Sequence, residues 1–101
     1  MKKLYISALL DVYGEFLSEK QRIVTDHYFN DDLSLAEIAE NEGIPRQGVY
    51  ALIKRAEAQL AEMEEKCHYC EYFWSLKSLG EDFRQGKENA IDEILEIIEK
   101  L

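Results

Sequence analysis

Apolar residues between Leu33 and Leu60 recur at helical spacing in two blocks, with Gly43 between them. A repeat of three or four residues places apolar side chains on one face of an α-helix, so each block predicts an amphipathic helix. The inward residues are Leu35, Ile38 and Ala39 in the first helix and Val49, Leu52, Ile53 and Ala56 in the second. Two short helices joined by a glycine turn predict a helix-turn-helix.

Residues that favour helix ends frame both helices. Ser34 and Glu37 have the spacing of a capping box, in which each side chain accepts a hydrogen bond from the other residue's backbone amide. Gly43 can take the left-handed conformation that ends a helix, and Ile44 is expected to fill the corner. Pro45 fits the first turn of the second helix, where its missing N–H costs nothing.

The outward face of the second helix has the side chains of a surface that reads DNA. Arginine and glutamine form paired hydrogen bonds with base edges in the major groove, and lysine and arginine bind phosphates. The face therefore predicts a DNA recognition helix, and an ordinary helical hairpin is the alternative. The candidate DNA-binding residues are Arg46, Gln47, Tyr50, Lys54 and Arg55.

Two more helices are predicted before the helix-turn-helix. Residues 3–17 carry an apolar stripe at helical spacing, and Ser18 with Gln21 forms a second capping box that opens a helix over residues 19–29. We interpret His27, in the second of these helices, as a packed or partly exposed residue and not as a ligand or base. The expected inward residues are Leu4, Ala8, Leu9, Val12, Tyr13, Phe16 and Leu17 in the first helix and Ile23, Val24 and His27 or Tyr28 in the second.

Beyond the recognition helix the apolar positions alternate by three and four residues for three heptads, without a helix breaker. They are Ile53, Ala56, Leu60, Met63, Cys67, Cys70 and Trp74. Such a seam predicts that the recognition helix runs on to about Ser78. At 1.5 Å per residue this helix would be roughly 50 Å long, so its far half is expected to need a partner.

The carboxy-terminal segment predicts a last helix over residues 87–101, after interruptions at Leu79-Gly80 and Gly86. Its apolar residues cover more than one face, so it either folds back on its own chain or pairs across a two-fold axis. We favour a homodimer. The candidate dimerisation residues are Leu60, Met63, Cys67, Cys70, Trp74, Ile94 and Ile98.

Composition supports an all-α fold in one domain, residues 1–101, with a helix-turn-helix core over 3–60 and a helical extension over 61–101 for packing or dimerisation. The 101 residues include one proline and five glycines. No apolar run approaches the roughly 20 residues of a membrane span, and Asp11 and Glu15 interrupt any signal peptide. We therefore expect a cytoplasmic protein that makes no membrane contact.

The charge is acidic, with 21 acidic against 12 basic residues and a net charge of −9. This balance does not fit a protein that coats nucleic acid. Its distribution matters more, because residues 33–60 carry three basic and four acidic residues, whereas residues 61–101 carry five and eleven. DNA binding by a monomer is expected to be weak and salt-dependent.

The sequence Cys67-His68-Tyr69-Cys70 raises the question of a metal or redox site. A zinc site needs four ligands, and a redox thiol pair belongs at a helix amino terminus, whereas this pair lies inside a predicted helix at seam positions. We interpret both cysteines as small buried hydrophobic residues without a disulfide. No phosphate-binding loop or nucleophile with a paired base is present, so we predict no enzymatic activity, metal or cofactor.

Together with the segment before it, the helix-turn-helix resembles region four of bacterial sigma factors, and more closely the YlxM-type family of small bacterial helix-turn-helix proteins. The resemblance covers roughly residues 8–66. It implies an all-α fold like sigma region four, to which the apolar periodicity described above adds an extended recognition helix and a carboxy-terminal helix. The residues that carry it are Leu17, Lys20-Gln21, Tyr28, Asp31-Asp32-Leu33-Ser34-Leu35, Glu37-Ile38-Ala39-Glu40, Arg46-Gln47, Val49-Tyr50, Ile53-Lys54-Arg55 and Glu57.

The resemblance also implies a role near the signal recognition particle, because genes of this family lie beside those of the particle and its GTPases. Two alternative functions are therefore expected. The first is a regulator that binds DNA, and the second is a module that binds the particle's GTPase subunit or RNA, since the acidic tail suits a basic partner. A sigma-like polymerase accessory is a weaker third, because the chain has no region for binding the polymerase core.

Overall fold

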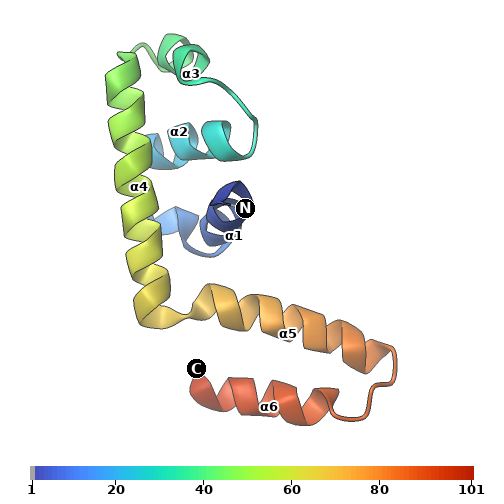
Figure 1. The fold of residues 1–101 in the computed structure, drawn as a ribbon. Helices are drawn as coiled ribbons and strands as arrows, with labels where there is room; N and C mark the ends of the chain where they lie inside the picture. The colour runs from blue at the N-terminus through green and yellow to red at the C-terminus, as the bar shows by residue number, and fades with distance from the viewer. Residues whose placement is uncertain (1) are drawn as a thin grey trace. The chain divides into compact units, whose positions relative to one another are not determined.

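Six α-helices, one 3₁₀ turn and their short connections make up residues 2–101, the part of the chain that the structure describes. In this computed structural model the elements are α1 (Lys2–Tyr13), η1 (Gly14–Phe16), α2 (Glu19–Phe29), α3 (Leu35–Glu42), α4 (Arg46–Cys67), α5 (Tyr69–Arg84) and α6 (Ala90–Lys100). No strand occurs among the described residues, so the predicted all-α class is confirmed (Figure 1). None of these helices is long and apolar enough to cross a membrane. The chain divides into an amino-terminal unit that ends at Lys66 and a carboxy-terminal unit from Cys67 to Leu101.

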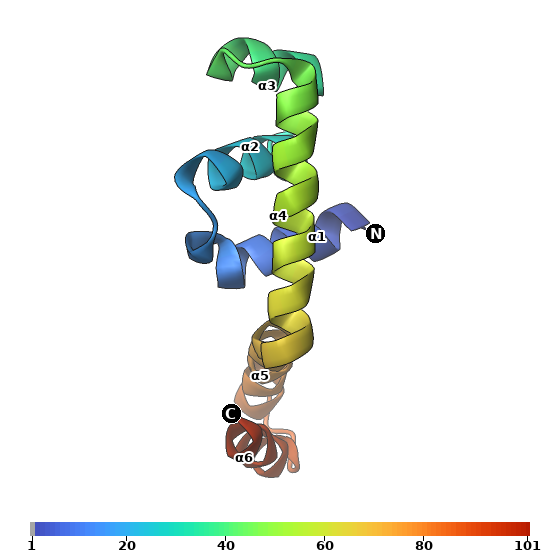
Figure 2. The ribbon, with the colours of Figure 1, turned by 90° about the vertical axis from the view of Figure 1, so that its left-hand side faces the viewer.

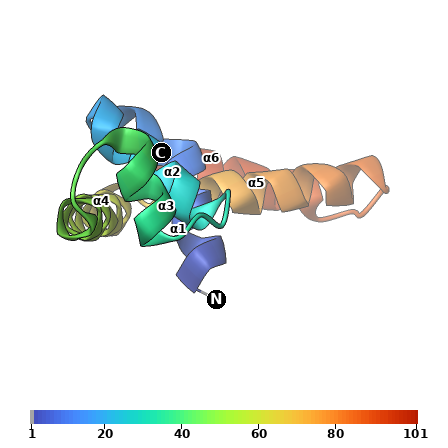
Figure 3. The same ribbon diagram turned by 90° about the horizontal axis from the view of Figure 1, so that it is seen from above.

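In the amino-terminal unit, α1, α2 and α3 pack on one side of α4 (Figures 1 and 2). Seen along the axis of α4, the three helices lie to one side and leave the opposite side of α4 uncovered (Figure 3). Burial of apolar side chains between these helices is the main stabilising term for such a bundle. The buried residues are Ile6, Leu9, Tyr13, Gly14, Leu17, Gln21, Val24, Thr25, Phe29, Ile38, Ala39, Val49, Ile53, Ala56 and Leu60.

The helix ends agree with the sequence predictions. Ser18 and Ser34 each cap a helix in a complete capping box, with Gln21 and Glu37 as the reciprocal partners. Gly43 ends α3 in the left-handed region, at φ 67°, and donates its backbone N–H to the carbonyl of Ala39. Pro45 lies just before α4 and accepts a hydrogen bond from the Val49 amide at 3.1 Å.

The α3 capping box should make helix stability depend on pH. Hydrogen bonds from the backbone amide and hydroxyl of Ser34 lower the pKa of Glu37 below its ordinary value of 4.5. A lowered pKa means that the stabilisation is present above that ordinary value and is lost as the pH falls through the lowered pKa. We therefore expect the free energy of unfolding to fall less steeply at acid pH in Glu37→Gln than in the unmodified chain, as measured by unfolding at several pH values followed by circular dichroism. The same change at the exposed Glu40 should leave the pH dependence as it is in the unmodified chain.

The predicted inward face of the first helix is confirmed only in part. Leu9, Tyr13 and Leu17 are buried as predicted, but Ile6 is buried as well, and Leu4 in α1 and Phe16 in η1 are 74% and 75% exposed. Because α1 is apolar at most positions, two stripes with helical spacing can be drawn along it, and only packing against α2 and α4 selects one.

The buried face of α2 also differs from the prediction, because it includes polar residues. Gln21 is 5% exposed, and its side-chain amide donates to the Gln59 side chain on α4 at 2.6 Å. Val24 is buried as predicted, whereas Ile23 is only partly buried and Tyr28 is exposed. His27 is partly exposed and lies 2.8 Å from the Asp31 carboxylate, in agreement with our interpretation of this residue.

The continuous helix predicted to Ser78 is wrong. Helix α4 ends at Cys67, His68 takes the left-handed conformation at φ 58°, and α5 begins at Tyr69. Histidine is one of the non-glycine residues enriched in this region, so a break can occur without glycine or proline. The heptad spacing was misleading because Ile53, Ala56 and Leu60 are already buried in the core of the amino-terminal unit.

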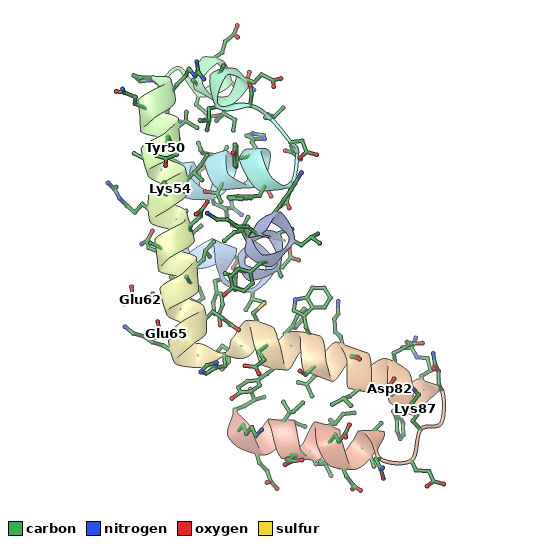
Figure 4. All side chains as sticks on the ribbon, viewed as in Figure 1. Tyr50, Lys54, Glu62, Glu65, Asp82 and Lys87 are labelled. Carbon is green, nitrogen blue, oxygen red and sulfur yellow. The ribbon has the colours of Figure 1, made fainter. Side chains whose placement is uncertain are left out.

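The carboxy-terminal unit is a helical hairpin. Helix α5 continues through Gly80, the predicted stop, to Arg84, and α6 begins at Ala90. Gly86 makes the turn at φ 83°, and Lys87 pairs with Asp82 across it at 3.2 Å (Figure 4). Cys67 is exposed, contrary to prediction, whereas Cys70 is buried as predicted.

Candidate nucleic-acid interface

The five predicted recognition residues lie together on α4. All of them are exposed and fall within the first three turns of the helix. Tyr50 and Lys54 lie at the border of α4 with the other helices, where they line a pocket together with Lys2, Tyr28 and Leu35. Tyr50 is 52% exposed, so about half of this large side chain is accessible to a ligand. We call the surface formed by Arg46, Gln47, Tyr50, Lys54 and Arg55 the α4 face.

Buried residues directly behind the α4 face fix its orientation. Val49 and Ala56 are 0% exposed and Ile53 is 3% exposed, so the inner side of the same turns is locked into the core. A helix that is anchored in this way cannot rotate about its axis without exposing apolar area. The outward side chains are therefore presented in a fixed direction.

A lysine from the start of the chain extends the α4 face. The Lys2 ammonium lies 2.9 Å from the Glu57 carboxylate, and the Lys54 ammonium lies 3.7 Å from the same carboxylate. The hydrogen bond to Glu57 and its negative charge raise the pKa of Lys2. Two ammonium groups share one carboxylate, so one positive charge is left uncompensated beside the α4 face. No local sequence pattern indicates this contact, because Lys2 and Glu57 are far apart in the chain.

Two further contacts favour a cationic surface here. The Lys54 ammonium lies 5.4 Å from the centroid of the Tyr50 ring, within the range of a cation–π interaction that orders both side chains. Lys20 on α2 pairs with Glu42 at the end of α3 at 2.8 Å. This pair neutralises the last acidic residue of α3, just before the turn that leads into α4.

The sign of the charge reverses halfway along α4. Arg46, Lys54 and Arg55 belong to the first half of the helix, whereas Glu62 and Glu65 are exposed on the second half (Figure 4). Anionic ligands are attracted by the first half and repelled by the second. The arrangement suits an anionic surface that contacts only the amino-terminal end of the helix, as in helix-turn-helix docking to a major groove.

The predicted dimerisation residues are divided between the two units. Leu60 is 0% exposed within the core of the amino-terminal unit, so it is not free to contact a second chain, and Met63 is partly buried in the same unit. The others belong to the carboxy-terminal unit, where Trp74 and Ile98 are exposed and Ile94 is partly buried. Cys67 is exposed there and Cys70 is buried.

Gly48 lies inside the first turn of α4, and its substitution provides a stability test beside the α4 face. An added Cβ would lie 3.9 Å from both Ile44 Cδ1 and Pro45 Cδ, an ordinary contact distance. Because alanine favours a helix over glycine by about 1 kcal/mol, we expect Gly48→Ala to raise the free energy of unfolding by about 0.5–1 kcal/mol in urea. Gly43→Ala should lower it, since alanine is strained at φ 67°. A loss of stability in Gly48→Ala would show that the backbone of α4 is not regular at this position.

Comparison with known proteins places nearly the whole chain in one family. Residues 1–100 match the family described as “Putative helix-turn-helix protein, YlxM / p13 like”. A UPF0122 protein of Shouchella clausii is 39% identical over 105 residues, which cover 99% of this chain and 96% of that protein. One of Acetivibrio thermocellus is 44% identical over 98 residues, or 96% of this chain and 75% of that protein. One of Clostridium kluyveri is 51% identical over 70 residues, and the match spans 69% of this chain and 63% of that protein.

Proposed function

Because the chain belongs to the UPF0122 family of YlxM/p13-like helix-turn-helix proteins, we propose that it is a regulatory protein that binds DNA through the α4 face. The observation that carries this proposal is the set of five exposed polar residues in the first three turns of α4, with buried apolar residues on the inner side of the same turns. Such a helix presents its amino-terminal half to the edges of base pairs in the major groove.

Each residue has a role that follows from its chemistry and its place on the helix. Arg46 and Gln47, at the amino terminus, are suited to paired hydrogen bonds with a guanine and an adenine. Lys54 and Arg55, about two turns further along, are suited to phosphates on either side of the groove. Lys2 adds a further phosphate contact, because Glu57 already holds its ammonium beside Lys54.

The charge of the chain sets the expected strength of binding. Three or four cationic side chains face the DNA in a protein whose net charge is −9. Each phosphate that is neutralised contributes about 0.9 to the slope of log affinity against log salt, so we expect a slope of roughly −3 for one α4 face. Affinity should therefore be modest and should fall steeply as salt is added.

A titration at two salt concentrations tests the proposal. The purified chain is titrated against labelled promoter DNA from its own operon, against a shuffled duplex of the same composition, and against reconstituted signal recognition particle. Saturable binding that prefers the promoter and weakens with salt is the expected result. Equal binding to both duplexes, or no binding to either, would overturn the proposal.

The same titration decides the alternative function. The acidic residues outside the α4 face favour a basic protein surface as a partner, and the gene neighbourhood of the family points to the signal recognition particle. Binding to the particle alone would mean that this helix-turn-helix serves the particle's GTPase or RNA. The acidic half of α4 and the carboxy-terminal hairpin would then be the regions expected to bind the particle.

A further inference from the structure

The carboxy-terminal hairpin buries little of its apolar surface. In residues 67–101, all of which the structure describes, only Cys70 and Ala90 are buried. The large apolar residues that stay exposed are Tyr69, Phe73, Trp74, Phe83, Ile91, Leu95, Ile98 and Leu101. A unit of this size does not ordinarily leave so many large apolar side chains in water unless another surface covers them.

Most of the exposed apolar residues lie on one of the two faces of the hairpin. The other face is marked by a groove of mixed character, which is lined by Trp74, Ser75, Ser78 and Leu79 on α5 and by Glu93, Glu96, Ile97 and Lys100 on α6. At 100° per residue, the positions opposite this groove are apolar on both helices. They are Tyr69, Phe73, Leu76 and Phe83 on α5 and Ile91, Leu95 and Ile98 on α6, and we call this surface the apolar face. Trp74 lines the groove and is not part of it.

The two outer edges of the apolar face carry opposite charges. By the same periodicity, Lys77, Glu81 and Arg84 follow the α5 edge, and Asp92 and Glu99 follow the α6 edge. Arg84 pairs with Glu81 on its own helix at 3.4 Å, so Lys77 supplies the net positive charge of the α5 edge. The Lys77 ammonium lies 5.0 Å from the centroid of the Phe73 ring and 5.3 Å from that of the Trp74 ring, so it lies at the edge between the apolar face and the groove. The surface is therefore apolar in the middle, positive on one side and negative on the other.

We propose that a second copy of this chain covers the apolar face, so that the two hairpins form an intermolecular four-helix bundle. A two-fold axis parallel to the helices places α5 of one copy on α6 of the other. This arrangement brings the Lys77 edge of one copy to Glu99 of the partner subunit, and both charged edges are satisfied at once. A perpendicular axis would place α5 on α5 and bring like charges together, and a purely basic or acidic partner would match only one edge.

This inference does not depend on DNA binding, and it is tested on the full chain without any ligand. Sedimentation equilibrium should give twice the mass of 11.8 kDa for the unmodified chain. Leu95→Gln with Ile98→Gln should weaken the dimer roughly 100-fold or more, since two anchors are lost from each subunit. Both side chains are about half exposed in the single chain, so circular dichroism should show unchanged helix content.

The matched control removes exposed apolar surface from the other unit. Leu4→Gln with Phe16→Gln changes two side chains that are 74% and 75% exposed, and it should leave the dimer as strong as in the unmodified chain. A monomer at the highest soluble concentration of the unmodified chain would overturn the proposal. Equal weakening by the control pair would overturn it as well.

A charge exchange tests the arrangement of the two copies. Lys77→Glu alone and Glu99→Lys alone should each weaken self-association about tenfold, because each places like charges at both ends of the two-fold interface. An equimolar mixture of the two variants should form a heterodimer more readily than either variant forms a homodimer. If the mixture associates no better than the separate variants, α5 does not lie on α6 of the partner subunit, and the proposed bundle is wrong.

Discussion

Replacement of Leu60 by alanine is expected to lower the free energy of unfolding by about 3 kcal/mol. Leu60 is 0% exposed and ends the buried series of Val49, Ile53 and Ala56 along α4. Removing a buried leucine side chain costs its transfer free energy and leaves a cavity, and measured values lie between about 2 and 5 kcal/mol. Urea unfolding followed by circular dichroism at 222 nm, the ordinary helix signal, measures the change.

The control and the concentration dependence decide what Leu60 does. Leu4→Ala changes a leucine that is 74% exposed, and it should alter stability by less than about 0.5 kcal/mol. The loss in Leu60→Ala should be the same at all protein concentrations, because the residue belongs to the core of its own chain. If the free energy of unfolding is lowered only at concentrations where the chain is dimeric, Leu60 contributes to an interface between subunits instead.

The second large effect concerns the proposed binding to DNA. Arg46→Ala combined with Lys54→Ala should weaken promoter binding by about 100-fold at moderate salt, since one base contact and one phosphate contact are removed at about 1–3 kcal/mol each. The salt slope should become shallower by about 1. Fluorescence anisotropy with labelled promoter DNA measures both quantities.

A lysine further along the same helix provides the matched control for this prediction. Lys66 is exposed in the last turn of α4 and pairs with Glu62 at 2.9 Å, beyond the reversal of charge. Lys66→Ala should leave promoter affinity within about twofold of the unmodified chain, because a paired surface lysine outside the α4 face has little effect. Unchanged affinity in the Arg46 and Lys54 double variant would remove the α4 face from any role in DNA binding.

Local sequence signals predicted the helix-turn-helix because its ends are determined by neighbouring residues. A serine and an acid or amide three positions later make both capping boxes, and Gly43 alone supplies the left-handed turn. These interactions depend on the identity of two or three residues and on nothing further away. The same holds for the α4 face, whose five residues are exposed because the turns behind them are apolar.

Features that depend on distant packing were not predictable in this way. Ile6 and Leu4 are equally apolar, and only the position of α2 and α4 decides that Ile6 is buried. The contact between Lys2 and Glu57 joins the two ends of the amino-terminal unit and leaves no trace in local spacing. The break at His68 occurs where apolar periodicity continues without interruption, so no pattern of apolar residues could reveal it.

The hydrogen bond between Gln21 and Gln59 has a consequence for the geometry of recognition. Sliding α2 along α4 by one turn would leave two amide groups without partners in a largely apolar contact, at about 1–3 kcal/mol for each. Apolar side chains alone tolerate such a slip far better, because they have no preferred direction. The Gln21–Gln59 pair therefore favours one register of α2 on α4 over other registers that would bury a similar apolar area. The position of α2 along α4 is thus maintained by a polar residue that lies outside the α4 face.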